Sequence, residues 1–179
     1  RQLKLQGKLK EVTQIGAELV NDDSSAADAE IIATVIDCFN EIGISDFQIE
    51  IGQIDYFKGL VAESGISEDE EDQIKEYIHI KNFFGLEEYV DALDISDSLK
   101  KAFVAFDSLF GGISMLDKAE GYVSNETSLE AVKRLRRVYA ALECYGYQDH
   151  ISFDLGMLDG YNYYTGIIFR GYTYGTGDA

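Results

Sequence analysis

Proline is absent from the 179-residue sequence, so we expect its turns to be built with Gly, Asn and Asp. Cysteine and histidine occur only twice each. Cys38 and Cys144 fall inside helix-like patterns without the spacing of a metal site. This favours two small core residues in a reduced, cytoplasmic protein. His79 and His150 lie far apart in the sequence, which argues against a paired-histidine metal centre, and we expect no metal and no cofactor.

Long apolar runs are missing as well, and no basic-then-apolar leader opens the sequence. A membrane-spanning helix needs roughly 18 or more consecutive apolar residues, so we expect no membrane segment.

Cations are scarce: Lys and Arg total 15 against 33 Asp and Glu, for a net charge of −18. An acidic surface repels phosphate backbones, so we expect no nucleic-acid partner. A phosphate-binding patch and a solvated helix face are both open for the basic cluster Lys133, Arg134, Arg136 and Arg137.

The common catalytic and nucleotide-binding motifs are also missing. No P-loop, no G-x-G-x-x-G opening a helix and no G-x-S-x-G elbow occurs. Paired carboxylates are too frequent in so acidic a sequence for their spacing to single out a site. A candidate site must therefore come from other residues.

Apolar periodicity predicts a strand, a helix and a second strand in the first part of the chain. The first strand covers residues 11–20, and the second covers residues 47–54, where apolar and polar residues alternate. Helical spacing lies between them, with Ser24 or Ser25 as the N-cap and Gly43 just after the end.

The last part of the chain predicts one long helix followed by two strands. Thr127 or Ser128 opens the helix and Gly146 ends it. Strands over residues 150–158 and 163–174 then follow, joined by a tyrosine- and glycine-rich bend that suggests a hairpin.

These elements indicate an α+β fold with an antiparallel sheet flanked by helices. Residues 55–123 carry helical patterns separated by glycines, which predicts an insertion of four or five short helices. Residues 1–54 and 124–179 would then form one incomplete core domain.

Two groups of polar and aromatic side chains are candidates for a ligand pocket. Gln14 and Glu18 are four residues apart in the first predicted strand, so both point to one face. Tyr163 and Tyr164 supply hydroxyl groups and flat walls. Together they suit a small, zwitterionic, ring-bearing ligand. The alternatives are a solvent-facing strand side and tyrosines that pack across a hairpin.

At these residues the sequence resembles a known family. "Q-I-G-A-E" at residues 14–18 looks like the segment after motif 2 of the histidyl-tRNA synthetase group of class II synthetases. "M-L-D-G-Y-N-Y-Y-T-G-I-I-F" at residues 157–169 resembles the histidine-binding fingerprint L-V-R-G-L-D-Y-Y-T-G of that group. The resemblance covers most of the chain, and the two motifs stand in the family's order. It implies a class II synthetase-like sheet with a helical insertion.

Three departures distinguish members of the family. The fingerprint's arginine, which neutralises phosphate oxygens during adenylate formation, is replaced by Asp159. Asn162 replaces the fingerprint's aspartate, and Arg170 stands where the family more often has an acid. A carboxylate in place of the arginine would repel the nucleotide triphosphate, at a cost of several kcal/mol. Asp159 thus marks a lost catalytic position.

The resemblance therefore points to the non-catalytic paralogue, the regulatory subunit of the short-form ATP phosphoribosyltransferase. It implies a role in the first step of histidine biosynthesis and in feedback regulation by histidine. It also implies a catalytic partner subunit, histidine as effector, and a homodimer through the synthetase-like core. The alternatives are a fragment of a true histidyl-tRNA synthetase and a plain binding or scaffold domain.

The family pattern also assigns roles to the candidate site residues. Glu18 and Tyr164 match positions that contact the imidazole in the synthetases, Gln14 matches one near the α-amino group, and Tyr163 matches a pocket wall. Whether the paralogue binds histidine in this pocket or at a subunit interface stays open. The sequence starts within or just past motif 2 and ends before the next family segment, which predicts an internal piece of a longer protein.

Overall fold

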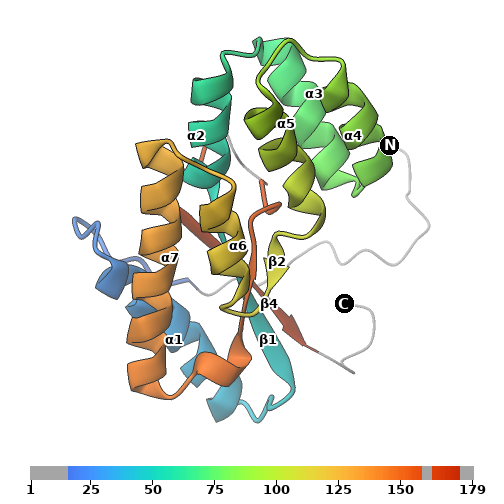
Figure 1. Ribbon diagram of the computed structural model, residues 1–179. Helices are drawn as coiled ribbons and strands as arrows, with labels where there is room; N and C mark the ends of the chain where they lie inside the picture. The colour runs from blue at the N-terminus through green and yellow to red at the C-terminus, as the bar shows by residue number, and fades with distance from the viewer. Residues whose placement is uncertain (1–15, 159–162, 174–179) are drawn as a thin grey trace, which may run out of the picture.

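The computed structural model describes residues 16–158 and 163–173. Figure 1 shows α1 and α7 side by side at one end of the molecule, with α3, α4 and α5 grouped at the other. In chain order the elements are α1 (Ser25–Glu41), β1 (Phe47–Gln53), α2 (Ile54–Ser64), α3 (Glu68–His79), α4 (Phe83–Asp91), α5 (Asp97–Val104), the short 3-10 helix η1 (Ala105–Asp107), β2 (Phe110–Gly111), α6 (Met115–Gly121), α7 (Glu126–Tyr145), the 3-10 helix η2 (Gln148–His150), β3 (Ile151–Asp154) and β4 (Ile167–Thr173).

Within the described residues, four strands form one sheet in the order β2-β3-β1-β4. β1 runs parallel to β3 and antiparallel to β4, and β2 pairs antiparallel with β3. Because β1 lies between β3 and β4, the predicted hairpin of the last two strands is wrong. The parallel pair β1–β3 needs a long crossover connection, and the helices from α2 to α7 supply it. The α+β class is confirmed, with a mixed rather than wholly antiparallel sheet.

The segment over residues 55–123, all of which the structure describes, is mostly helical as predicted. It also contributes β2, whose Phe110 lies opposite Asp154 of β3. The segment therefore adds a short strand to the sheet as well as helices. The boundary between a core domain and an insertion stays a prediction.

Helix α1 begins where its sequence predicts. The Ser24 side chain caps it by accepting from the Ala27 N–H at 3.1 Å. Gly43, at φ +81°, follows the last turn in the left-handed conformation that glycine adopts without strain. The buried face of α1, which carries Ile32 and Ile36, packs within the main core.

Helix α7 begins slightly earlier than predicted. Asn125, rather than Thr127 or Ser128, is the N-cap, and its side chain accepts from the Ser128 N–H at 2.7 Å. Ser128 is instead fully buried, and its hydroxyl donates to the Tyr56 carbonyl at 2.8 Å. Gly146 ends the helix in the left-handed conformation at φ +79°, as predicted.

Helices α2 and α7 cross at very short range. A Cβ on Gly59 would lie only 2.8 Å from the Ser128 backbone nitrogen. Nearby, the Tyr56 hydroxyl donates to the Ala119 carbonyl at 2.9 Å and is fully buried. Burial raises the pKa of this Tyr56 phenol. A residue larger than glycine at position 59 would push the two helices apart, so this crossing depends on that glycine.

Two smaller expectations differ from the structure. Residues 16–20 of the predicted first strand are exposed and lie in no strand, while residues 11–15 lie outside the described part. Cys38 and Cys144 are both exposed rather than buried, because each falls on the solvent side of an amphipathic helix. His150 has a structural role: its ring stacks on Phe47 with centroids 4.2 Å apart.

Candidate functional site

The two tyrosines of the predicted pocket lie just before β4, not in a strand. Tyr163 is 85% exposed and Tyr164 52%, and their rings meet edge to face with centroids 5.0 Å apart. Helix α2 holds the backbone here: Lys58 Nζ donates to the Tyr164 carbonyl at 3.4 Å, and the Ile54 N–H donates to the Gly166 carbonyl at 3.1 Å. Packing across a hairpin does not account for these side chains, because both face solvent.

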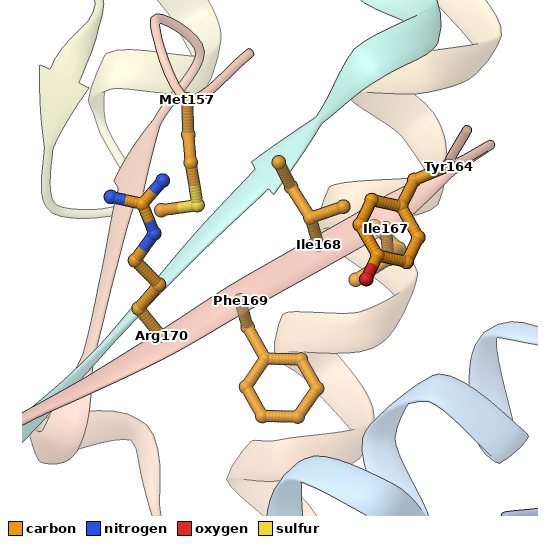
Figure 2. A pocket seen from close by; sticks show the side chains of 6 residues that line it. All are labelled: Met157, Tyr164, Ile167, Ile168, Phe169 and Arg170. Carbon is orange, nitrogen blue, oxygen red and sulfur yellow. The ribbon is translucent and has the colours of Figure 1, made fainter. Parts of the chain in front are cut away.

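Tyr164 lines a cavity of about 320 Å³ beside β4. Figure 2 shows Met157 and Arg170 at one end of this cavity and Tyr164 at the other. The lining is completed by Ile167, Ile168 and Phe169. An apolar lining with one aromatic hydroxyl and one guanidinium is a suitable environment for a small ring-bearing ligand that carries a carboxylate.

A group of charged side chains lies on the strands next to this cavity. Glu50 of β1 stands opposite Arg170 of β4 and accepts a hydrogen bond from the Tyr172 hydroxyl at 3.3 Å. Burial and then the carboxylate of Asp154 raise the pKa of Glu50, while Tyr172, Lys81 and Arg170 act in the opposite direction. The two carboxylates, Glu50 and Asp154, thus face two cations, Lys81 and Arg170, so the charges on this part of the sheet largely balance.

The other half of the predicted pocket is only partly described. Gln14 lies outside the described residues, whereas Glu18 belongs to an exposed segment, residues 16–24, that leads into α1. In the two described ranges, no hydrogen bond joins Glu18 to Tyr163 or Tyr164. The structure thus brings the two tyrosines together and places Glu18 on a separate segment.

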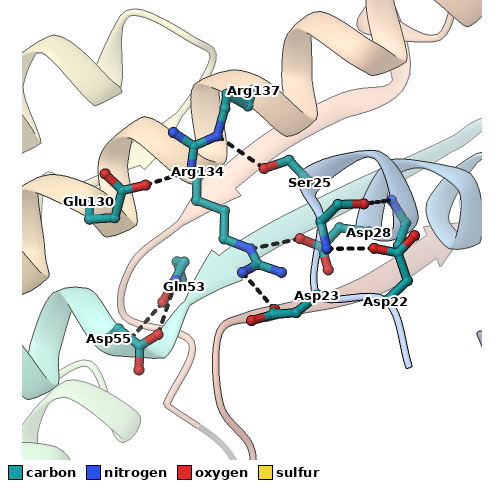
Figure 3. Close-up of polar contacts among 11 residues, drawn as sticks. Asp22, Asp23, Ser25, Asp28, Gln53, Asp55, Glu130, Arg134 and Arg137 are labelled. Atoms are coloured by element: carbon teal, nitrogen blue, oxygen red, sulfur yellow. Dashed lines mark hydrogen bonds and ion pairs between the residues drawn. The ribbon is translucent and has the colours of Figure 1, made fainter. Parts of the chain in front are cut away.

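The end of that segment is fastened to α7 by Arg134 (Figure 3). Arg134 Nη1 donates to Asp23 Oδ1, and Arg134 Nε donates to Asp28 Oδ2, both at 2.8 Å. The hydrogen bond to Asp28 is the largest influence that raises the pKa of Arg134. Asp22 Oδ1 also accepts from the Ser24 N–H at 2.9 Å, which shapes the turn into α1. One guanidinium therefore joins α7, α1 and residues 21–24.

The other two arginines of the basic cluster on α7 also pair with carboxylates of the chain, and Lys133 is exposed. Arg136 donates to Asp117 at 2.7 Å and to Glu120 at 3.1 Å. Arg137 donates to Glu130 at 2.6 Å and to the Ser25 hydroxyl at 3.1 Å. Since these guanidiniums already pair with carboxylates, the phosphate-patch interpretation is not supported, and a paired, solvated helix face describes them better.

Two features of this region are missing from the sequence-based prediction. Glu50 was marked only as a polar residue of an alternating strand, and that alternation is the signal that places it on the side of the sheet away from the core. Arg134 was treated as part of a basic run. Its partners are 106 and 111 residues away, so no local pattern predicts them.

Comparison with known protein families shows to which family this chain belongs. A family profile described as histidyl-tRNA synthetase matches residues 1–179, the whole chain. The chain belongs to the histidyl-tRNA synthetase family. This confirms the predicted resemblance and the class II synthetase-like fold.

Curated relatives of this chain share one name. The ATP phosphoribosyltransferase regulatory subunit of Acetivibrio thermocellus is 45% identical over 171 residues, covering 96% of this chain and 41% of the relative. The regulatory subunit of Clostridium acetobutylicum is 38% identical over 176 residues, covering 97% and 43%. The chain thus spans less than half the length of these relatives.

Solved structures of family members share the fold. The ATP phosphoribosyltransferase regulatory subunit/histidyl-tRNA synthetase from Bacillus halodurans C superposes with a TM-score of 0.79 at 30% identity, covering 88% of this chain and 41% of that one. The ATP phosphoribosyl transferase (HisG:HisZ) complex from Thermotoga maritima contains a chain that matches with a TM-score of 0.66 at 18% identity, covering 85% and 53%. At the latter identity the likeness concerns the fold alone.

For this member of the histidyl-tRNA synthetase family, the role of position 159 stays a prediction. Asp159 and Asn162 lie outside the described residues. On either side of them, Leu158 is buried and Tyr163 is exposed. No helix in the described part of the chain is long and apolar enough to cross a membrane.

Proposed function

We propose that this chain is part of the regulatory subunit of an ATP phosphoribosyltransferase and that it has no aminoacylation activity of its own. The observation that carries the proposal is the shared name of relatives up to 45% identical along 96% of the chain. The full-length protein would assemble with the catalytic subunit in the first step of histidine biosynthesis. We also propose a cytoplasmic location, where this biosynthetic role is carried out.

The substitution at position 159 supports loss of nucleotide activation. Formation of an aminoacyl adenylate requires cations around a triphosphate. Asp159 replaces the fingerprint arginine, whereas the carboxylates of Glu50 and Asp154 on the neighbouring strands are offset by Arg170 and Lys81. Each reversed charge near a phosphate costs several kcal/mol at a dielectric constant typical of protein surfaces.

An ATP–pyrophosphate exchange assay on the full-length protein with histidine tests this proposal. We expect no exchange above the background without enzyme, while a histidyl-tRNA synthetase run alongside gives robust exchange. Exchange that depends on histidine would instead favour the second candidate, a fragment of a true synthetase. That candidate is kept because the family profile and the Bacillus halodurans structure both carry the synthetase name.

Reconstitution with the catalytic subunit tests the regulatory role. We expect the full-length protein to co-purify with the transferase and to change its sensitivity to histidine. Coupling between an effector and a distant active site is typically about 1–3 kcal/mol, or roughly a 5- to 150-fold change in affinity. A protein that neither binds the transferase nor alters its inhibition would be a scaffold domain.

We further propose that histidine binds at the site formed by Gln14, Glu18, Tyr163 and Tyr164. Glu18 would accept from the imidazole N–H, and Tyr164 would contribute its hydroxyl and ring. The exposed tyrosines and the cavity beside β4 support this assignment. A homodimer through the synthetase-like core is part of the same proposal, and sedimentation of the full-length protein measures it.

A further inference from the structure

The two described halves of the candidate histidine site are both tethered to the pair of helices α2 and α7. On one side, α2 holds the tyrosine segment through Lys58 and Ile54. On the other side, α7 holds residues 21–24 through Arg134. The two helices are themselves joined by the hydrogen bond between the Ser128 hydroxyl and the Tyr56 carbonyl. The α2–α7 pair is thus the common frame for both halves.

Chain connectivity makes the contact on α7 important for Glu18. Glu18 lies five positions before Asp23, and a fully extended chain of that length spans at most about 18 Å. Residues 16–20 lie in no helix or strand and are exposed. Their position therefore depends on the residues that follow them, and on any contacts that residues before them make.

We propose that Arg134 is a positioning residue of this site, because it anchors residues 16–24, and hence Glu18, to the frame that also holds Tyr164. This inference rests on the proposed histidine site. Figure 3 shows the guanidinium between α7 and the two carboxylates. The Arg134 and Asp28 side chains are only 18% and 20% exposed, whereas the Asp23 side chain is 95% exposed.

The two contacts of Arg134 differ in solvent exposure and therefore in their structural roles. The contact between Arg134 and Asp28 joins α7 to α1 and is shielded from solvent. The contact between Arg134 and Asp23 reaches out to the segment and is open to salt. The outer contact is therefore weak enough to be broken without unfolding the protein, and it acts on the position of the segment.

Asp23→Asn in the full-length protein isolates the outer contact. Exposed ion pairs are worth about a 1.5- to 5-fold change in an equilibrium constant. We expect hydrogen exchange at the Ser24 amide, which donates to Asp22 Oδ1, to speed up by about that factor, and the Kd for histidine to rise by a similar factor. Arg134→Lys should give part of the same change. Lysine keeps the positive charge but lacks the fixed guanidinium geometry that lets Nε and Nη1 reach two different carboxylates.

Asp117→Asn is the matched control. It removes an exposed carboxylate from Arg136, a neighbouring arginine on α7 that has no contact with residues 16–24 among the described residues. Both readouts should stay at the wild-type value in this variant. The wild-type histidine affinity should also weaken with added salt more than that of Asp23→Asn.

The outcomes separate the two proposals. Unchanged exchange at the Ser24 amide in Asp23→Asn would overturn the anchoring role of Arg134. Faster exchange with an unchanged histidine Kd would show that the segment is anchored but does not position the ligand, which also overturns the inference. If the wild-type protein binds no histidine, the proposed site fails, while the exchange data still show whether Arg134 holds the segment.

Discussion

The frame of the molecule and the segments that carry its candidate site are built differently. Helices α2 and α7 meet through the buried Ser128 and the close approach at Gly59, and α2 also carries the fully buried Tyr56 and Phe57. The segments over residues 16–24 and 163–166 are exposed, and a few hydrogen bonds and one ion pair hold them to that frame. The frame therefore determines stability, while the segments are free to determine ligand binding.

The largest change in stability should come from removing a buried aromatic side chain from α2. Phe57 is fully buried and meets Phe103 and Phe106 edge to face, with centroids 5.9 and 5.7 Å away. Phe57→Ala should lower the free energy of unfolding by about 3–5 kcal/mol through lost burial and a new cavity. Urea denaturation measures it.

Phe84→Ala is the matched control for the loss of an aromatic ring. Phe84 is 72% exposed, so we expect a change within about 0.5 kcal/mol. Equal effects of the two substitutions would contradict the division between a buried frame and tolerant surface segments.

Adding a side chain where α2 and α7 cross should have the next largest effect on stability. Gly59→Ala places a methyl group 2.8 Å from the Ser128 backbone nitrogen and should destabilise the protein by about 1–3 kcal/mol. Gly121→Ala, at the end of α6 with open space around it, is the control and should be neutral or slightly stabilising. Thermal unfolding compares them, and a neutral Gly59→Ala would mean that the crossing is adaptable.

A site segment should respond to substitution in binding rather than in stability. Glu18→Ala should weaken histidine binding by about 1–3 kcal/mol, because a charged hydrogen-bond partner is lost, and should leave unfolding almost unchanged because Glu18 is exposed. Glu143→Ala, which removes an exposed carboxylate on α7, should change neither property. Calorimetry with the full-length protein measures the affinity, and an unaltered affinity in Glu18→Ala would remove Glu18 from the site.

The smallest change in stability should come from Glu50, a charged residue of the sheet. Burial raises the pKa of Glu50 in the folded state, so the folded protein binds this proton more tightly than the unfolded chain does. Stability from this group is therefore greatest at low pH and falls as pH rises from about 4.5 through the raised pKa.

Glu50→Gln keeps an acceptor for Tyr172 and removes that charge. It should raise stability at pH 7 by no more than about 0.5 kcal/mol, since the group is only partly buried and solvent screens its charge. The difference from the wild type should shrink toward pH 4. A variant that is less stable than the wild type at pH 7 would show that the ionised form is favoured.

Local patterns predicted the helices better than the strand pairing. Ser24, Gly43 and Gly146 mark helix ends because capping depends on neighbours along the chain. The hairpin of the last two strands was wrong because pairing depends on which strand fills the space between them, and β1 does so from more than 100 residues earlier.

The candidate site shows the same division. Glu18, Tyr163 and Tyr164 were singled out by residue type and family resemblance, and the structure adds that the tyrosines are exposed and adjacent. Gln14 and Asp159 lie outside the described residues, so their roles stay predictions. Arg134 was not predicted as a site residue, because both its partners come from a distant part of the chain.

The sequence by itself determined the family, the fold class and the ends of the main helices, because these depend on motifs and on the periodicity of neighbouring residues. Only the tertiary structure decided that β1 separates the last two strands, that the arginines of α7 pair with carboxylates, and that α2 and α7 together hold both halves of the candidate site. Those features are contacts between residues far apart in the chain, and their geometry exists only once the core has brought the helices and the sheet together.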